Sequence, residues 1–483
     1  MAMLGKRRTP STRARAQGSQ GAESPLPQAI TPGALVIERL AHDGRGVTRS
    51  VVGKTVFVDR ALPGEQVEIA VHRERRRFDE AHVRRRLIDA ATRVTPPCEH
   101  YERCGGCDLQ HMAIEAQRDH KRQVLTELLA RQGIEPPRTV DLLSGRDAGY
   151  RRRARLGVKV SRDGEVHLGF RVRGSDQLID IDSCYVLAPS LAALLQPLRR
   201  QLQSLAAPRH VGHIELLAGD DGAAHVIVRQ LRSVPEDARR WAEFATRERL
   251  ALALREGREA PVLRWLGGPG AAPASLTTRV DAGGQPISLG FEPGDFLQVN
   301  AEINQQLIDR AREWLELDAS ERLLDLFAGI GNFALSLAPD VDRVTAVEGS
   351  QAMVERLNDN ARCNGFETVE ARQADLSTVD GLLETWLAEH DVVVLDPPRD
   401  GADAICRRLG ASAASRVLYV SCDPASLARD AAHLRENGFC LERLAIADMF
   451  PHTAHLESMV LFSRGTATAV GGRDSAATRR DRR

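Results

Sequence analysis

Aromatic residues and lysine are scarce in this 483-residue sequence, and long apolar runs are absent. Only 4% of the residues are aromatic, and lysine occurs at four positions, Lys6, Lys54, Lys121 and Lys159. No stretch of eighteen consecutive apolar residues occurs, which excludes an ordinary membrane-spanning helix. The polar, Arg-rich residues 1–20 lack the apolar segment of a secretory signal, although a mitochondrial presequence would have a similar composition. We therefore expect a cytoplasmic protein that does not enter the membrane.

The charges balance over the whole chain but not along it. The 66 Lys and Arg residues equal the 66 Asp and Glu residues in number, which by itself argues against a polyanionic partner. Residues 1–200, however, hold 35 basic and 24 acidic residues, a balance of +11, whereas residues 201–450 hold 25 and 39, a balance of −14. Such segregation indicates that the first half faces a polyanion. The preference for Arg suits bidentate contacts to phosphate, but a GC-rich genome would also produce it.

Both ends of the chain, residues 1–29 and 465–483, mix Ser, Gly and Arg without periodicity and are predicted to be disordered tails. Between residues 30 and 90, short alternating runs are separated by the turn sequences DGRG and LPGE, which is typical of a small β-barrel or sandwich. The last of these strands are rich in Arg. They are expected to form a nucleic-acid surface, and the competing interpretation is a solvated edge strand.

Residues 91–290 are predicted to form a central α+β domain, in which a helix within residues 110–135 can pack on the last domain. Residues 190–280 look like an α/β insertion without recognisable chemistry. Between residues 291 and 464, the apolar strands LLDLF, VTAVE, DVVVLD and RVLYVS alternate with helices near residues 352–360, 382–390 and 424–436. Strands without polar alternation are typical of a parallel sheet covered on both faces, so we expect a doubly wound α/β domain.

Four of the eight cysteines lie in the first half of the chain. Cys98, Cys104 and Cys107 have the spacing C-x5-C-x2-C, and Cys184 follows 77 positions later. In a cytoplasmic protein such a group is more often a metal site than a set of disulfides. Four thiolates suit either Zn²⁺ or an iron–sulfur cluster, and the spacing alone favours neither.

The sequence DLFAGIGNF, residues 325–333, follows an apolar strand and leads into a helix. Gly329 and Gly331 allow a ligand to approach the backbone where the strand ends. A dinucleotide-binding fingerprint would have a third glycine where Ala334 stands, so the match fails. Glu348 ends the next strand, 19 residues after Gly329, where a carboxylate can hydrogen-bond a ribose. Together these residues indicate a nucleoside ligand, and the missing glycine favours S-adenosylmethionine over NAD.

Two further acidic residues follow strands of the same domain. Asp375 comes after a short β-like run, where it can contact the base of the same ligand. Asp396 begins the sequence Asp-Pro-Pro-Arg, whose prolines fix φ and hold the carboxylate at the carboxyl edge of the sheet. Enzymes that methylate the amino groups of bases carry an aromatic residue at the end of a related loop. Arg399 stands there instead, which argues against amine methylation.

Cys422 follows the next strand and is expected at the same edge of the sheet. A thiolate there can add to C6 of a pyrimidine, so that C5 accepts a methyl group from a sulfonium donor. A base must then remove the C5 proton before the cysteine can leave. His452, His455 and Glu457 are candidates, and a carboxylate with a raised pKa suits this proton. Packing is the alternative role for a lone cysteine at a strand end, and we assign it to Cys363, Cys406 and Cys440.

The strings DLFAGIGNF, DPPR, SCDP, FLQVN and FPHTAHLESMVLF together resemble the RNA uracil-C5 methyltransferases, which use S-adenosylmethionine. DGRGV and ALPGEQVEIAV resemble the TRAM domain, an OB-like RNA-binding barrel, and the cysteine spacing resembles the [4Fe–4S] site of the ribosomal-RNA members. The resemblance covers residues 30 to about 464, apart from residues 190–280. It implies a Rossmann-like class I methyltransferase domain, and a monomer that methylates C5 of a 23S rRNA uridine, expected to be uracil-1939, through a covalent cysteine–C6 adduct.

The resemblance also implies roles for single residues. Cys422 would be the nucleophile and Glu457 the general base. The residues against S-adenosylmethionine would be Gln298, Phe327, Asn332, Glu348, Asp375 and Asp396. The ligands of the [4Fe–4S] cluster would be Cys98, Cys104, Cys107 and Cys184. At two positions, Asp375 and Asp423, some family members have the near-isosteric Asn, a difference that concerns contacts rather than the activity.

Other functions fit parts of the pattern. Related enzymes methylate another 23S uracil, two 23S uracils, or the T-loop of tRNA, and the tRNA enzyme resembles only the C-terminal half of this chain. A non-catalytic iron–sulfur RNA-binding protein would need neither Cys422 nor Glu457. Cytosine-C5 methylation usually comes with a Pro-Cys nucleophile motif, where this chain has Ser-Cys-Asp-Pro. For a stacked uridine, the reaction at C6 also requires base flipping.

Overall fold

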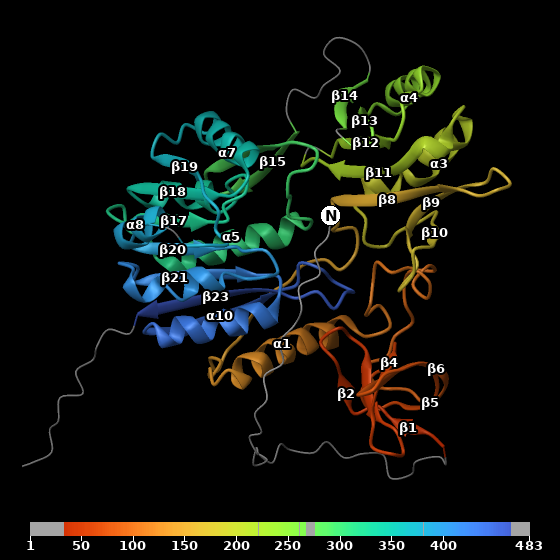
Figure 1. Cartoon of the computed structure of the whole chain (residues 1–483), viewed down its shortest axis with the longest axis horizontal. Coiled ribbons are helices and arrows are strands. Elements are labelled where there is room, and N and C mark those ends of the chain that lie inside the picture. The colour runs from red at the N-terminus through yellow and green to blue at the C-terminus, as the bar shows by residue number, and fades with distance from the viewer. Residues whose placement is uncertain (1–32, 221, 260, 267–275, 380, 465–483) are drawn as a thin grey trace, which may run out of the picture.

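The computed structural model describes residues 33–464, apart from residues 221, 260, 267–275 and 380. The two predicted tails, residues 1–29 and 465–483, lie outside the described residues. Figure 1 shows the eight-stranded sheet and its helices on the left, the seven-stranded sheet at the upper right and the six-stranded sheet at the lower right. Among the described helices, none combines the length and apolar character needed to cross a membrane.

The first sheet has six strands in the order β1-β5-β6-β4-β3-β2. Its core is small and consists of aliphatic side chains such as Ile37, Val56, Val58 and Val67. The Arg side chains at residues 84–86 are exposed on β6. The strands are β1 Leu35–Val36, β2 Arg39–Leu40, β3 Gly46–Arg49, β4 Thr55–Asp59, β5 Gln66–Glu74 and β6 Phe78–Ile88.

The second sheet has seven strands in the order β10-β9-β8-β11-β12-β13-β14. Residues 190–280, expected as an insertion, complete this sheet: β11 pairs antiparallel with β8, with Ile214 opposite Leu156. This pairing joins segments about sixty residues apart, so no local pattern predicts it. The elements are β8 Arg153–Val160, β9 Val166–Arg171, β10 Leu178–Asp180, α2 Pro189–Ala192, α3 Leu195–Ser204, η1 Pro208–His210, β11 Val211–Ala218, β12 Ala224–Gln230, α4 Pro235–Glu248, β13 Ala251–Glu256 and β14 Val262–Trp265.

The third sheet has eight strands in the order β19-β18-β17-β20-β21-β23-β22-β7. The first five run parallel, as the apolar runs predict, and β23 lies antiparallel between β21 and β22. The strands are β7 Asp141–Leu143, β17 Arg322–Leu326, β18 Arg343–Glu348, β19 Val369–Gln373, β20 Val392–Leu395, β21 Arg416–Ser421, β22 Phe439–Ala447 and β23 Glu457–Arg464. The helices of this region are α5 Ala301–Leu315, α6 Ala334–Leu337, η2 Ala338–Asp340, α7 Gln351–Cys363, α8 Gly381–Glu389, α9 Asp403–Cys406, η3 Leu409–Ala411 and α10 Pro424–Glu436.

Helices cover both faces of the parallel strands. Successive side chains of each strand point to opposite faces of the sheet, so they pack in two different cores. On β20, Val392 and Val394 pack with residues of α5 and α7 on one face. Val393 and Leu395 pack with residues of α8, α9 and α10 on the other face. This arrangement confirms the predicted doubly wound sheet and leaves the carboxyl ends of its strands free for a ligand.

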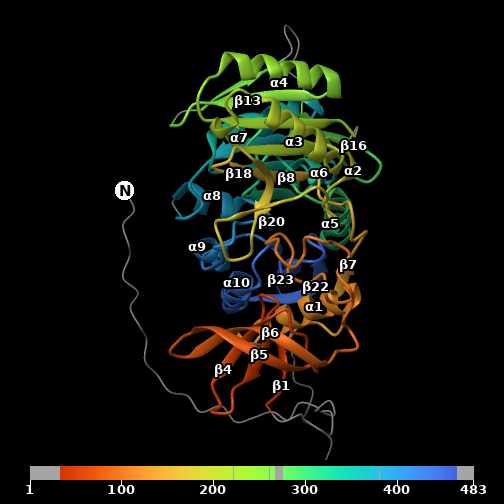
Figure 2. The same cartoon turned by 90° about the vertical axis from the view of Figure 1, so that its right-hand side faces the viewer.

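Segments from outside residues 291–464 also pack on this sheet. The short strand β7 pairs parallel with β22 at the sheet edge, and helix α1, Ile114–Arg131, packs against α10 through Leu125 and Leu129. The hairpin of β15 Leu276–Asp281 and β16 Pro286–Phe291 contacts α7. Figures 1 and 2 show α1 between the eight-stranded and the six-stranded sheet. A helix of the central segment therefore touches the domain that carries the candidate site.

Candidate active site

The predicted site residues meet at the carboxyl ends of β17, β18, β20 and β21. A cavity of about 750 Å³ opens there. Every residue expected to contact the nucleoside ligand lines this cavity, and so do the expected nucleophile and base. The lining includes Gln298, Phe327, Asn332, Glu348, Asp375, Asp396, Cys422 and Glu457. The eight predicted residues that meet in this cavity span 159 positions of the sequence, from Gln298 to Glu457.

The glycine-containing loop forms one wall of the cavity. Phe327 has a left-handed backbone with φ of 67°, which is uncommon for a residue with a side chain and often occurs at functional sites. The Gly329 amide donates to Glu348 Oε2 at 3.1 Å, and the Ser350 amide donates to Glu348 Oε1 at 2.9 Å. These bonds fix the carboxylate beside the loop. Gly331 has a different function, because a Cβ at this position would lie 3.0 Å from Leu335 Cγ, in the protein core.

Side-chain amides and hydroxyls fix the neighbouring polar groups. Asn332 and Asn304 form a reciprocal amide pair, with distances of 2.9 and 3.0 Å between the donor nitrogens and acceptor oxygens. Asp375 Oδ1 accepts from the Ser377 hydroxyl at 2.6 Å and from the Ser377 amide at 2.9 Å. The side-chain bond from Ser377 is the main reason that the pKa of Asp375 is lowered. The carboxylate is therefore ionised and oriented at neutral pH.

Strand pairing places Cys422 next to Glu457. Ser421, the last residue of β21, lies opposite Ser458 on β23. Cys422 directly follows Ser421 where β21 ends, and Glu457 directly precedes Ser458 at the start of β23, so the two residues lie at neighbouring strand ends, where the charge of Glu457 acts on the Cys422 thiol. Asp396 follows β20, the parallel neighbour of β21, and its side chain lines the same cavity. Cys422 is partly buried, whereas Glu457 is only 5% exposed.

Burial raises the pKa values of three groups in the site, Asp396, Cys422 and Glu457. Desolvation raises the pKa of Asp396 to about 7. Desolvation, followed by the charge of Asp396, raises the pKa of Glu457 well above its ordinary value. Desolvation and the charges of Glu457 and Asp396 raise the pKa of Cys422 to about 11, while Arg399 lowers it. A cation in the cavity would favour the charged forms of these carboxylates, so the site suits a sulfonium ligand.

Cys422 also lines a second cavity, of about 400 Å³. We call residues 98–109 the cysteine segment. The walls of the second cavity come from the turn after β2 at His42, the cysteine segment at Asp108, α1 at His120, and the loops at Arg399 and His455. Arg399 Nη2 lies 3.5 Å from His455 Nδ1. His455 thus faces the second cavity, and the His452 ring packs instead against the ring of Tyr185, with 5.5 Å between the centroids. Of the three candidate bases, only Glu457 lines the first cavity.

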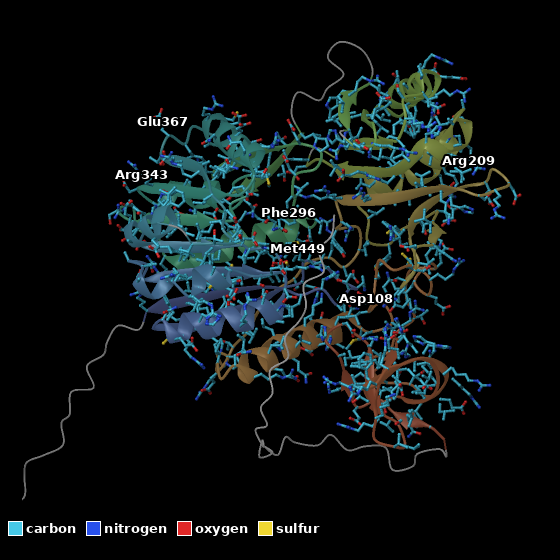
Figure 3. The ribbon with its side chains drawn as sticks, viewed as in Figure 1. Asp108, Arg209, Phe296, Arg343, Glu367 and Met449 are labelled. Carbon is cyan, nitrogen blue, oxygen red and sulfur yellow. The ribbon has the colours of Figure 1, made fainter. Side chains whose placement is uncertain are left out.

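Two residues that line the first cavity, Arg152 and Thr278, carried no recognisable signal in the sequence. Arg152 precedes β8, is 6% exposed, and donates to the Gln298 carbonyl oxygen at 2.8 Å and to Thr278 Oγ1 at 2.8 Å. Phe296 is 64% exposed and lines the cavity next to Gln298. Figure 3 shows Phe296 on the side of the eight-stranded sheet that faces the other two sheets. Arg152 and Thr278 come from outside the predicted domain, so only the folded chain reveals them.

The four predicted ligand cysteines lie in one region, away from the first cavity. Cys98, Cys107 and Cys184 belong to one cluster with Tyr101 and Tyr150. The Cys104 segment joins β9 through a bridge to Val172. Burial is the main reason that the pKa of Cys107 is raised to about 12, and the charges of the other three thiols raise it further. Among the described residues, no three thiols have their sulfur atoms all within 4.8 Å of one another.

Comparison with known proteins relates most of the chain to two groups of enzymes. Residues 274–465 match the family model of tRNA (Uracil-5-)-methyltransferase. The chain is 55% identical over 482 residues to the 23S rRNA (uracil(1939)-C(5))-methyltransferase RlmD of Chromohalobacter salexigens, covering 100% of this chain and 99% of the relative. It is 54% identical over 466 residues to the Halomonas elongata protein of the same name, with coverages of 95% and 93%.

A solved structure of a tRNA enzyme has the same fold over most of the chain, so the expectation that such an enzyme resembles only the C-terminal half is wrong for this relative. The tRNA (uracil-54, C5)-methyltransferase of Pyrococcus abyssi, in complex with S-adenosyl-L-homocysteine, superposes with a TM-score of 0.68. The superposition covers 89% of this chain and all of that chain, at 23% sequence identity. At this identity the similarity shows the fold, and the assignment to a family rests on the sequence relatives.

Proposed function

The chain belongs to the RlmD family of 23S rRNA (uracil(1939)-C(5))-methyltransferases, and on this basis we propose that it transfers a methyl group from S-adenosylmethionine to C5 of uracil 1939 in 23S rRNA. The observation that carries the proposal is that one cavity holds Cys422, Glu457 and the residues expected around the methyl donor. A thiol and a buried carboxyl beside a donor site are what methylation of an unreactive pyrimidine carbon needs.

Cys422 is the nucleophile in this proposal. Its thiolate, formed after the thiol loses its proton to solvent, adds to C6 of the uracil, which makes C5 nucleophilic, and C5 then takes the methyl group that S-adenosylmethionine supplies. Glu457 accepts the C5 proton, after which the C6–sulfur bond breaks and the cysteine thiolate leaves. The raised pKa of Glu457 makes it a stronger base than an ordinary carboxylate. The register of β21 and β23 supports this pairing of roles.

The residues around the methyl donor have complementary chemistry. The Glu348 carboxylate, held by the Gly329 and Ser350 amides, can accept from the ribose hydroxyls. Asp375 can accept from the adenine amino group, and Asp396 contributes negative charge near the sulfonium. Gln298, Phe327 and Asn332 complete the wall of the cavity.

The RNA approaches Cys422 through the second cavity in this proposal. This cavity opens between the six-stranded sheet and the catalytic loops, so an extruded nucleotide would pass between both. The six-stranded sheet acts as a TRAM domain, and the exposed Arg side chains of residues 84–86 contact phosphates. The chain works as a monomer in the cytoplasm, where it meets ribosomal RNA.

The four cysteines of the central segment bind a [4Fe–4S] cluster in this proposal. Four cysteine thiolates are the ligand set of such a cluster. Cys98, Cys107 and Cys184 belong to one side-chain cluster, and the Cys104 thiol lies near enough for its charge to act on Cys107, which supports a shared centre. Cys98, Cys104, Cys107 and Cys184 would hold the cluster, which would brace the segment, because methyl transfer moves no net electrons.

The chemical roles can be tested with a 23S rRNA fragment that contains uracil 1939. We expect the wild type to form 5-methyluridine and Cys422→Ala to form none. Glu457→Gln should accumulate a covalent protein–RNA adduct, seen as a slower band on a denaturing gel, because the C5 proton is no longer removed. Cys440→Ala, which changes an exposed cysteine, is the matched control and should retain activity. Product formation by Cys422→Ala at the wild-type rate, or the absence of an adduct with Glu457→Gln, would contradict the proposal.

A further inference from the structure

The catalytic base follows a loop without regular structure, residues 448–456, which we call the Glu457 loop. We propose that helix α1 positions Glu457 by holding this loop, with Gln117 and the Lys121–Asp448–Arg118 ion pairs as positioning residues. The inference rests on the proposed role of Glu457. Figures 1 and 2 show α1 beside the eight-stranded sheet, far in sequence from the loop that it contacts.

Gln117 makes the most specific of these contacts. Its side chain is 1% exposed, and its Oε1 accepts from the His452 amide at 2.9 Å. Its Nε2 donates to the Met112 and Leu109 carbonyl oxygens at 2.7 and 3.1 Å and lies 3.3 Å from His452 Nδ1. One side-chain amide thus joins α1, the end of the cysteine segment and the Glu457 loop. Such a buried network has one satisfied arrangement, which fixes the position of the loop.

A buried ion-pair group holds the start of the same loop. Lys121 Nζ lies 2.8 Å from Asp448 Oδ1, and Arg118 Nε lies 3.0 Å from Asp448 Oδ2. The side chains of Lys121 and Asp448 are 2% and 1% exposed. Lys121 also donates to the Phe450 carbonyl oxygen at 3.0 Å. Removing one partner of a buried ion pair destabilises a protein much more than removing one partner of a surface pair, because the other charge stays buried and unpaired. This group therefore strongly favours one position of the loop.

The cysteine segment holds the loop from the other side. The His452 carbonyl oxygen accepts from the amides of Asp108 and Leu109, both at 2.9 Å, and these residues directly follow Cys107. The Ala454 amide donates to Asp108 Oδ2 at 3.3 Å. Figure 3 shows Asp108 and Met449 near the junction of the three sheets. The cysteine segment is therefore connected to the Glu457 loop by these three hydrogen bonds.

The backbone of the loop needs such support. His452 has φ of 67°, a conformation that costs energy for a residue with a side chain. Glu457 is the first residue of β23, so a shift of the loop would move its carboxyl group relative to Cys422. Gln117, Arg118 and Asp448 do not line either cavity described above. Their effect on the reaction is therefore exerted through the loop, whereas Lys121 also lines the second cavity.

The variant Gln117→Met tests the inference, because it keeps the length of the side chain and removes its hydrogen bonds. We expect kcat to fall by about tenfold or more, with KM for the RNA fragment and for S-adenosylmethionine nearly unchanged. The covalent protein–RNA adduct should accumulate during turnover, as with Glu457→Gln, because proton removal becomes slow. Hydrogen exchange of residues 448–456 should be faster than in the wild type.

The matched control is Gln123→Met, on the exposed side of the same helix, which should behave as the wild type. If Gln117→Met does not fold, Arg118→Met provides the second test, with the same expected split between kcat and KM. Wild-type adduct levels in these variants, or a loss of RNA affinity without a loss of kcat, would overturn the inference. Failure of Glu457→Gln to form an adduct would instead refute the proposed function on which the inference rests.

Discussion

At the scale of single residues, the reactivity of Cys422 depends on charges that the sequence does not place. The residue types Cys422 and Glu457 identified the chemistry from the sequence. The direction of the pKa shifts required the structure, because it depends on burial and on the distance to Asp396 and Arg399. Arg152 and Asn304 could not be identified at all, since their places in the site result from tertiary packing.

The thiol of Cys422 should react faster when the neighbouring negative charge is removed. The charge of Glu457 raises the pKa of Cys422, so Glu457→Gln should lower that pKa and increase the thiolate fraction at pH 8. Each unit of pKa changes this fraction by about tenfold while the thiol is mostly protonated. Iodoacetamide labelling of the Cys422 peptide, followed by mass spectrometry in the absence of RNA, measures the change.

A variant that should raise the pKa of Cys422, instead of lowering it, provides the control for this prediction. Arg399 lowers the pKa of Cys422, so Arg399→Gln should slow the labelling at the same pH. The exposed Cys363, far from the site in sequence, should label at the same rate in every variant. Equal labelling of Cys422 in all three proteins would show that these charges do not control the thiol.

At the scale of elements, local patterns predicted the strands and helices that carry the site. The strands β17, β18, β20 and β21 were predicted because each is a continuous apolar run. The side chain of Asp423, next to the nucleophile, caps α10 by accepting from the Ala425 and Ser426 amides at 3.1 and 2.8 Å. Asp and Asn are both good N-caps, which explains why either residue suits this position. Strand β7 was missed because three residues carry no periodicity.

The two glycines of the loop after β17 should respond differently to alanine. Gly331 has φ of 98°, and a Cβ there would lie 3.0 Å from Leu335 Cγ and 3.2 Å from Leu357 Cγ. Backbone strain alone should lower the free energy of unfolding by about 1–3 kcal/mol in Gly331→Ala, and the crowding should add to this loss. Gly329→Ala should cost less, about 1–2 kcal/mol, because its φ of 57° is the ordinary left-handed conformation. Urea unfolding of both variants checks the order, and equal losses would contradict it.

At the scale of the whole molecule, the neutral net charge is the sum of a basic region and an acidic region with different roles. Of the balance of +11 over residues 1–200, residues 1–29 contribute +4, and the remaining +7 belongs to residues 30–200, which include the six-stranded sheet, the cysteine segment, α1, β7 and part of the second sheet. The acidic residues 201–450 include most of the donor cavity. The sequence predicted this division, and it also led us to expect that a helix within residues 110–135 packs on the last domain, as α1 does. It could not predict that β7 joins the edge of the eight-stranded sheet, since a contact between distant segments leaves no local pattern.

The central claim is methylation of uracil 1939, and mapping 5-methyluridine in 23S rRNA by mass spectrometry tests it most directly. The rRNA would come from a strain that lacks this gene and carries either the wild-type gene or Cys422→Ala on a plasmid. We predict the modification at position 1939 with the wild-type gene and an unmodified uridine with Cys422→Ala. Methylation of position 1939 in the strain without the gene, or restoration at a different uridine only, would contradict the claim.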